Sequence, residues 1–254
     1  MLDHAGLAAM LDEAQRKATS IAPLTERHAL ALADSYAIQR HVVARRLARD
    51  ERLIGVKMGF TSAAMRRQMN VDHANWGRLT DRMAVDPAET LDLTKFIHPR
   101  AEPEVVFRLN RDLVPPFGLE EVRTAIDAVA AALEVVDTRY HEYRFKLEDN
   151  TADNSSAAAY AIGAWTRFSG DCARLPVTMT IDGVKVTEGS TADVLGDPVL
   201  SLAEAARLAA EDGQPLLRGW IVLTGGATAS IPLRTGNLVE VEIAEIGTAR
   251  LRVA

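Results

Sequence analysis

The chain has 254 residues, and its 29 lysines and arginines against 35 aspartates and glutamates give a formal net charge of −6. The hydrophobic fraction of 48% and the charged fraction of 25% are ordinary for one large or two small globular domains, which excludes a disordered, collagen-like or disulfide-stapled chain. The acidic balance argues against a nucleic-acid partner. The single cysteine, Cys172, fits a reducing compartment and is given no role.

No targeting or membrane segment is expected. The first residues lack the cationic stretch and apolar run of a signal peptide, and no later run approaches the roughly 18 apolar residues of a membrane span. We therefore expect a cytoplasmic protein that binds neither membranes nor nucleic acid.

The N-terminal part is predicted to be helical. Apolar residues recur at helical spacing over 7–14, and a second helix is expected over 35–50. From Leu53 the pattern changes to short extended runs, first at 53–60 and then at 102–109. Pro103 inside the second run indicates an edge or irregular strand.

The middle of the chain mixes patterns. Residues 119–132 are expected to form a helix that runs directly into a strand at 133–137. A polar segment at 146–156 follows. We then expect a hairpin, because two alternating runs flank Asp182-Gly183, the dipeptide that a tight two-residue turn prefers.

The C-terminal part completes an α+β protein. A helix and two strands are expected at 201–211, 220–223 and 238–243. The predicted organisation is a helical N-terminal region, 1–52, packed on a catalytic mixed β domain, 53–254, as a single functional unit.

Glu102 and Glu104 form a candidate metal-binding pair. They are two residues apart, so on a strand both carboxylates project from the same face, roughly 7 Å apart along the backbone. Such a pair is stable if the face is solvated, if a proton is shared, or if a cation is held, and Mg²⁺ takes carboxylate oxygens. Spacing alone favours a solvated strand face.

Glu134 lies inside an apolar run, 130–136, where its carboxylate would be buried. A buried carboxylate must be paired or bind a metal, and a salt bridge explains it as well as a metal does. Together with Glu102 and Glu104, it would make a three-carboxylate site that suits octahedral Mg²⁺ and leaves positions for a chelating substrate.

Lys57 lies in an apolar, glycine-flanked run, where its charge needs a partner or its pKa must fall. An active-site lysine and a strand lysine whose amino group reaches solvent explain this equally well.

Two loops are weaker candidates. Residues 149–156 are dense in groups that cap helices and form turns, which favours a turn or N-cap over a functional loop. Thr224-Gly225-Gly226 follows an expected strand and could bring backbone N–H groups close to an anion. The six histidines show no metal-ligand spacing, and neither a Walker-type nor a G-x-G-x-x-G loop is present.

Five blocks in the right order resemble the fumarylacetoacetate hydrolase superfamily, specifically its branch of 2-keto-4-pentenoate hydratases and 4-oxalocrotonate decarboxylases from the meta-cleavage catabolism of aromatic compounds. Each block alone is weak, whereas the five together span most of the chain. The blocks are IGVKMGFTS at 54–62, IHPRAEPE at 97–104, LEVVDTRY at 133–140, ADNSS at 152–156 and LTGGA at 223–227.

The resemblance implies a fumarylacetoacetate hydrolase-like mixed β-roll or barrel around a pocket. It implies a Mg²⁺ or Mn²⁺ site on Glu102, Glu104 and Glu134, with Lys57 beside it as the catalytic residue. The residues expected to bind or surround the substrate are Arg139, Asp153, Asn154, Ser155, Asn75 and Thr224.

Asn75 separates the two activities of this branch. Hydratases of the group typically carry an aspartate before the aromatic-glycine pair, whereas this sequence reads Ala74-Asn75-Trp76-Gly77. An asparagine cannot serve as that acid or base. The runs at 57–59, 61–62, 140–145 and 224–226 also resemble decarboxylases more than hydratases.

We therefore expect metal-dependent decarboxylation of 4-oxalocrotonate, a small 2-oxo acid. Lys57 would stabilise the developing enolate oxygen, and Arg139 would bind a carboxylate. Hydration of 2-hydroxypenta-2,4-dienoate or a fumarylacetoacetate-type C–C hydrolysis is the first alternative, and a non-catalytic partner subunit is the second. The resemblance also implies a homo-oligomer or a complex with a hydratase homologue.

Overall fold

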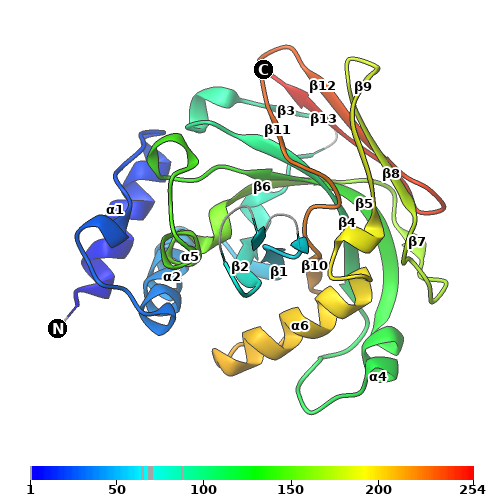
Figure 1. Cartoon of the computed structure of the whole chain (residues 1–254), viewed down its shortest axis with the longest axis horizontal. Helices are drawn as coiled ribbons and strands as arrows, with labels where there is room; N and C mark the ends of the chain where they lie inside the picture. The colour runs from blue at the N-terminus through cyan, green and yellow to red at the C-terminus, as the bar shows by residue number, and fades with distance from the viewer. Residues whose placement is uncertain (1, 64–65, 68–70, 87) are drawn as a thin grey trace.

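The N-terminal region is helical, as predicted. The computed structural model describes residues 2–63, 66–67, 71–86 and 88–254. Helices α1 (His4–Arg16) and α2 (Leu32–Leu47) pack against each other, and α2 also contacts α5 (Leu147–Ala152), so the three helices gather at one side of the molecule (Figure 1). Their shared apolar cluster is separate from the core of the sheets and includes Leu11, Ile38 and Tyr140.

The largest sheet has eight strands. The order of its main path is β2-β1-β10-β4-β5-β6, with β11 paired to β4 and β7 paired to β5. The strands are β1 (Leu53–Gly59), β2 (Asn75–Thr80), β4 (Arg100–Leu109), β5 (Ile126–Val136), β6 (Ala157–Ile162), β7 (Thr166–Arg167), β10 (Ile221–Leu223) and β11 (Ile231–Pro232).

This sheet curls so that its two ends meet. Ala84, just after β2, forms a bridge with Tyr160 of β6, and the Val85 N–H donates to the Tyr160 carbonyl at 2.8 Å. Side chains of β2, β4, β5, β6 and β10, among them Leu79 and Val106, meet in one apolar cluster. The inside of the roll is therefore lined by alternate residues of these strands, and the same face of β4 and β5 carries the candidate carboxylates.

A five-stranded sheet covers part of the outside of the roll. Its order is β3-β13-β12-β8-β9, and the main core includes Val241 and Leu251 of this sheet with Phe107 and Leu133 of the larger one. The strands are β3 (Thr90–Leu91), β8 (Pro176–Ile181), β9 (Val184–Ser190), β12 (Leu238–Ile243) and β13 (Gly247–Val253).

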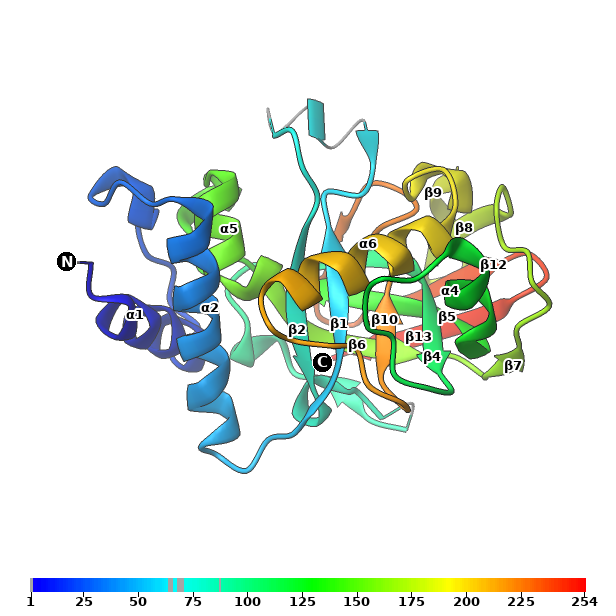
Figure 2. The same ribbon diagram turned by 90° about the horizontal axis from the view of Figure 1, so that it is seen from below.

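Helix α6 (Pro198–Glu211) lies against β1 and β2, as Figure 2 shows, and it also contacts α4 (Leu119–Thr124). Asp197 caps α6 by accepting from the Val199 N–H at 2.8 Å. The short 3₁₀ turns are η1 (Leu24–Glu26), η2 (Asp81–Met83), η3 (Leu93–Lys95), η4 (His141–Tyr143), η5 (Asn154–Ser156) and η6 (Thr191–Asp193).

The helix predicted over 119–132 is wrong beyond its first half. Helix α4 ends at Thr124 and β5 begins at Ile126. The alanines of 128–132 favour a helix locally, but they are paired with β4 along their whole length, and alanine side chains fit the crowded inside of the roll. Tertiary pairing therefore overrides helix propensity.

The edge position inferred from Pro103 is also wrong, because β4 is a central strand. On one side Pro103 pairs with Leu133 of β5. On the other side its carbonyl accepts from the Ala227 N–H at 2.9 Å, in the gap between β10 and β11. The missing N–H of proline falls in this gap, so no ladder bond is lost.

The hairpin expected around Asp182-Gly183 is confirmed. Strands β8 and β9 form the predicted hairpin, and Asp182 and Gly183 both have positive φ, 52° and 78°, as a tight primed turn requires. No helix of the described residues has the length and apolar character needed to cross a membrane. The boundary at 52/53 falls between α2 and β1, and the single functional unit stays a prediction.

Candidate metal centre and active site

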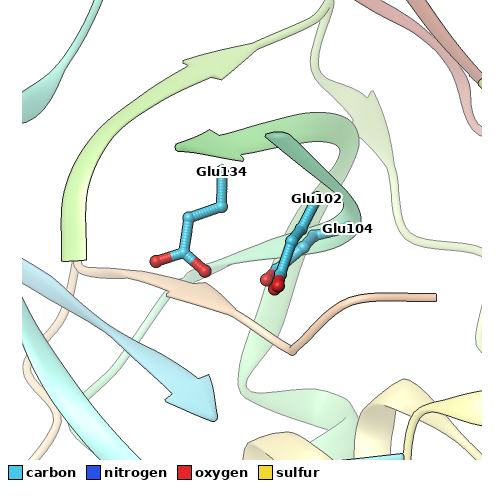
Figure 3. Close-up of side chains that lie close together, drawn as sticks. All are labelled: Glu102, Glu104 and Glu134. Atoms are coloured by element: carbon cyan, nitrogen blue, oxygen red, sulfur yellow. The ribbon is translucent and has the colours of Figure 1, made fainter. Parts of the chain in front are cut away.

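Three glutamates converge from two neighbouring strands. Glu102 of β4 lies directly opposite Glu134 of β5, and Glu104 lies two residues further along β4 on the same face. Each offers a carboxylate oxygen within 4.8 Å of the others, and Figure 3 shows the three side chains pointing toward one another. The spacing by two places Glu102 and Glu104 on one face, as expected from the sequence, and the pairing of β4 with β5 brings Glu134 to them.

The environment of these carboxylates fits a divalent cation. Glu104 and Glu134 are completely buried. One oxygen of Glu104, Oε2, accepts from the Gly225 N–H at 2.7 Å, but its Oε1 has no hydrogen-bond partner among the described residues. Neither oxygen of Glu134 has a hydrogen-bond partner there either, although Oε2 forms an ion pair with Lys57. A solvated strand face is thus the wrong interpretation, because buried oxygens with no partner are costly unless a cation or a proton satisfies them.

Lys57 is a buried lysine beside this cluster, not one that reaches solvent. Its Nζ lies 3.1 Å from Oε2 of Glu134 and donates to the Ser155 carbonyl at 2.9 Å. Burial alone lowers the pKa of Lys57, but the three nearby carboxylates, Glu134 first, outweigh burial and raise it above its usual value. Lys57 is therefore an ammonium ion at neutral pH.

One lysine does not neutralise three carboxylates. Burial, followed by the charge of Glu134, raises the pKa of Glu102 to about 7. Burial and Glu134 also raise the pKa of Glu104 well above its usual value. In the absence of a cation, Glu102 and Glu104 therefore keep their protons to a higher pH than exposed glutamates do.

Three consecutive residues next to Lys57, none of them glycine, adopt left-handed backbone conformations. Asn154, Ser155 and Ser156 have φ of 52°, 52° and 56°. Each such residue costs about 1–3 kcal/mol and persists only where the surroundings determine it. Asn154 is held by β2, since its Oδ1 accepts from the Arg78 N–H at 2.8 Å and its Nδ2 donates to the Arg78 carbonyl at 2.9 Å. The turn aims the Ser155 carbonyl at the amino group of Lys57.

Asn75 supports the same turn from β2. Its Oδ1 accepts from Ser155 Oγ at 3.1 Å, while its Nδ2 donates to Asn150 Oδ1 at 2.8 Å and to Thr151 Oγ1 at 2.9 Å. Asn75 is fully buried and is not part of the cavity wall. It reaches the cavity only through Ser155 and Asn150.

Arg139 does not lie where the sequence-based expectation places it. It is buried outside the cavity wall, pairs with the carboxylate and carbonyl of Asp153, and donates to the Asp137 carbonyl at 2.8 Å. Burial raises the pKa of Asp153 to about 6, although Arg139 opposes the shift. The guanidinium is taken up by this ion pair, so neither Arg139 nor Asp153 is placed to contact a substrate.

Thr224 also has a structural position. Its hydroxyl donates to the Val105 carbonyl at 2.8 Å, and its carbonyl accepts from Ser201 Oγ at 2.7 Å. The backbone N–H that meets an anion in this loop belongs to Gly225, and the anion is Glu104. Gly225 has φ of 104°, and a Cβ there would lie 2.1 Å from Thr61 Oγ1, so glycine is required.

A cavity of about 710 Å³ opens beside the cluster. Of the residues expected from the sequence, Lys57, Glu102 and Ser155 line it. Arg100 and Tyr143 also line it, and the sequence reasoning missed both. Arg100 had a usable signal, because it lies two residues before Glu102 on the same strand and therefore on the same face.

The comparisons with known proteins agree with this site. A model of the family described as fumarylacetoacetate (FAA) hydrolase C-terminal matches residues 79–254. The chain belongs to this family. The expected family and its mixed β-roll fold are therefore confirmed.

Relatives within the family include decarboxylases and hydratases. A 4-oxalocrotonate decarboxylase from a Pseudomonas species is 39% identical over 242 residues, covering 95% of the chain and 94% of that protein. A 2-hydroxyhexa-2,4-dienoate hydratase from Comamonas testosteroni is 33% identical over 248 residues, covering 95% and 94%. A solved 4-oxalocrotonate decarboxylase from Pseudomonas putida G7, complexed with magnesium and adipate, superposes with a TM-score of 0.95 at 32% identity, covering 99% of this chain and 97% of that one.

Proposed function

We propose that this protein decarboxylates 4-oxalocrotonate to 2-hydroxypenta-2,4-dienoate. The observation that carries the proposal is the cluster of three converging carboxylates beside the buried ammonium of Lys57, with Glu102 and Lys57 facing a cavity large enough for a six-carbon diacid. A relative of this name, 39% identical over nearly the whole chain, supports the same reaction.

Glu102, Glu104 and Glu134 are the residues that would hold the cation, and we propose Mg²⁺ or Mn²⁺. An all-carboxylate donor set favours hard cations of this kind, and the solved relative is complexed with magnesium. When bound, such a cation supplies Lewis-acid polarisation of a 2-oxo acid.

The reaction itself breaks one carbon–carbon bond. The bond between C5 and the C6 carboxylate carbon breaks, CO₂ leaves, and the electron pair moves through the C3–C4 double bond to the C2 oxygen. We infer that Lys57, a cation held by contacts with Ser155 and Glu134, stabilises the negative charge that develops on that oxygen. Protonation of the oxygen completes the dienol product.

Hydration of 2-hydroxypenta-2,4-dienoate at the same site is the second candidate. A hydratase 33% identical over 95% of the chain favours it. Asn75 opposes it, because its amide is fixed by three hydrogen bonds and acts as neither a general acid nor a general base at neutral pH. A non-catalytic subunit is disfavoured because a protein without chemistry gains nothing from three clustered carboxylates with buried oxygens that have no hydrogen bond.

The deciding experiment follows CO₂ release from 4-oxalocrotonate by the purified protein with Mg²⁺ and with EDTA, while ultraviolet absorbance follows the dienol. We expect metal-dependent CO₂ release. Consumption of 2-hydroxypenta-2,4-dienoate without CO₂ release from 4-oxalocrotonate would establish the hydratase instead.

Cytoplasmic location, a homo-oligomer and a complex with a hydratase homologue stay predictions. Size-exclusion chromatography with light scattering tests the two predicted assemblies.

A further inference from the structure

Arg100 is a cation of the cavity wall whose guanidinium forms no ion pair with the described residues. Lys57 and Arg100 are the only lysine or arginine side chains among the described residues that line the cavity. Lys57 is paired with Glu134, whereas Arg100 forms no ion pair in the part of the chain that the structure describes. The charge of Glu102 acts on Arg100 without forming an ion pair with it, so the half-buried guanidinium can still pair directly with an anion.

The side chain of Arg100 is held in place from one side. Its Nε donates to Ser230 Oγ at 2.8 Å and its Nη2 donates to the Ser230 carbonyl at 2.6 Å. Its Cζ lies 5.7 Å from the centre of the Tyr143 ring. These contacts leave Nη1 without a hydrogen bond to any described residue. Because the guanidinium is anchored through its other nitrogens, Nη1 can donate to a ligand from a fixed position.

The position of Arg100 relative to the carboxylate cluster defines the length of that ligand. Arg100 and Glu102 project from the same face of β4, and their Cα atoms are two residues apart, about 7 Å. A six-carbon diacid whose 2-oxo acid end lies at the cluster would bring its far carboxylate toward Arg100. Outside the cluster, the acidic residues of the wall are Glu142, Glu188 and Asp193, and Glu142 and Glu188 are paired with Arg144 and Lys185. None of the three attracts a carboxylate.

We propose that Arg100 binds the distal carboxylate of a dicarboxylic substrate and selects diacids over monoacids of equal length. This inference rests on the proposed function, and it identifies the subsite that the proposed reaction needs for its second carboxylate. The distal carboxylate is the group that departs as CO₂ and loses its charge in doing so. Arg100 therefore stabilises the bound substrate more than the transition state, and it acts on KM rather than on kcat.

Two ligands that differ only at the far end test the proposal without turnover. 2-Oxoadipate and 2-oxohexanoate share six carbons and the same 2-oxo acid end, and neither has the C3–C4 double bond that conjugates the leaving group to the ketone. Calorimetry of the Mg²⁺-loaded protein measures both affinities in the unchanged chain and in Arg100→Gln. In Arg100→Gln we expect the affinity for 2-oxoadipate to fall about tenfold or more and the affinity for 2-oxohexanoate to change less than about twofold.

Three further variants make the result specific. Arg108→Gln is the matched control, because Arg108 lies on the same strand but pairs with Asp127 outside the cavity, and it should change neither affinity. Arg100→Lys keeps the charge and should retain part of the preference for the diacid. Ser230→Ala removes one anchor and should weaken 2-oxoadipate selectively by a smaller factor, which keeps the test open if Arg100→Gln does not fold.

The outcomes separate this proposal from the reaction. A selective loss of affinity for 2-oxoadipate in Arg100→Gln, with a raised KM and an undiminished kcat for 4-oxalocrotonate, supports the subsite. An equal loss of affinity for both ligands, or no change in either affinity, overturns it. Absence of CO₂ release from the unchanged protein would overturn the proposed reaction and leave the diacid preference measurable.

Discussion

Glu102 and Glu134 face each other directly across the antiparallel β4–β5 ladder. Like charges at opposed positions destabilise a pair of strands, and burial here removes the water that would screen them. Lys57, 3.1 Å from Glu134, offsets one of the charges. The electrostatic cost that remains is the physical reason to expect a cation at this place.

Replacing Glu102 by glutamine should stabilise the metal-free protein and abolish its response to Mg²⁺. The change removes one of two opposed carboxylates and with it their repulsion. A gain of about 1 kcal/mol in the free energy of unfolding corresponds to a rise in Tm of about 2–4 °C for a chain of this size. Thermal unfolding with EDTA and with Mg²⁺ measures both effects. Glu142→Gln, an exposed glutamate at the cavity that is not in the cluster, is the control. A Glu102→Gln protein that Mg²⁺ still stabilises in full would contradict the assignment.

Mg²⁺ affinity should rise with pH through the neutral range. The pKa of Glu102 is raised to about 7, so a proton and the cation compete for the same carboxylate, and binding near that pH releases protons. In the metal-free protein the same shift makes stability fall as pH rises from about 4.5 to about 7, because the unfolded chain loses this proton first. Calorimetry in buffers of different ionisation enthalpy measures the number of protons released when Mg²⁺ binds. A Mg²⁺ affinity that does not depend on pH would contradict the prediction.

Lys57→Met should destabilise the metal-free protein and lower kcat by about 10²–10³, the usual loss when one donor to a developing oxyanion is removed. The buried ammonium is the nearest positive charge to Glu134, so its loss leaves the carboxylates without compensation. Added Mg²⁺ should restore stability but not kcat. Denaturant unfolding and CO₂ release measure the two effects, and a variant with unchanged kcat would exclude Lys57 from the reaction.

Asn75→Asp tests the distinction between the two activities. The carboxylate would face Oδ1 of Asn150, which now accepts from the Asn75 amide, so we expect a stability loss of about 1–3 kcal/mol unless the Asn150 amide turns over. We also expect a gain of hydration of 2-hydroxypenta-2,4-dienoate, measured as loss of its ultraviolet absorbance. Asn75→Ala, which lacks the new acid, should lose stability without this gain. Hydration by Asn75→Ala as well would show that residue 75 does not decide the reaction.

Asn154→Ala should loosen the turn that holds Lys57. It leaves the buried Arg78 N–H and carbonyl without their partners and places alanine at a φ of 52°, so we expect a loss of about 2 kcal/mol or more and a lower kcat. Asn154→Asp keeps the acceptor for Arg78 and should lose less of both. Denaturant unfolding and steady-state kinetics make the comparison, which fails if the two variants are equivalent.

The carboxylates of the candidate metal centre could be predicted in part from local sequence, whereas the position of Glu134 opposite Glu102 depends on the pairing of β4 with β5. Spacing by two on a strand places Glu102 and Glu104 on one face whatever the rest of the fold does, and an acidic residue within an apolar run marks Glu134 as buried. The Asp182-Gly183 turn was predictable for the same reason, since its dihedral angles depend on those two residues.

Pairing between distant segments decided the rest. Residues 128–132 are a strand because β4 lies beside them, although alanine alone favours a helix. Arg139 and Arg100 are both arginines in the recognised blocks, and only the fold shows that Asp153 occupies the first, whereas Ser230 holds the second at the cavity wall. A charge is available to a substrate only if no closer counterion takes it, and counterions come from segments that no local spacing brings together.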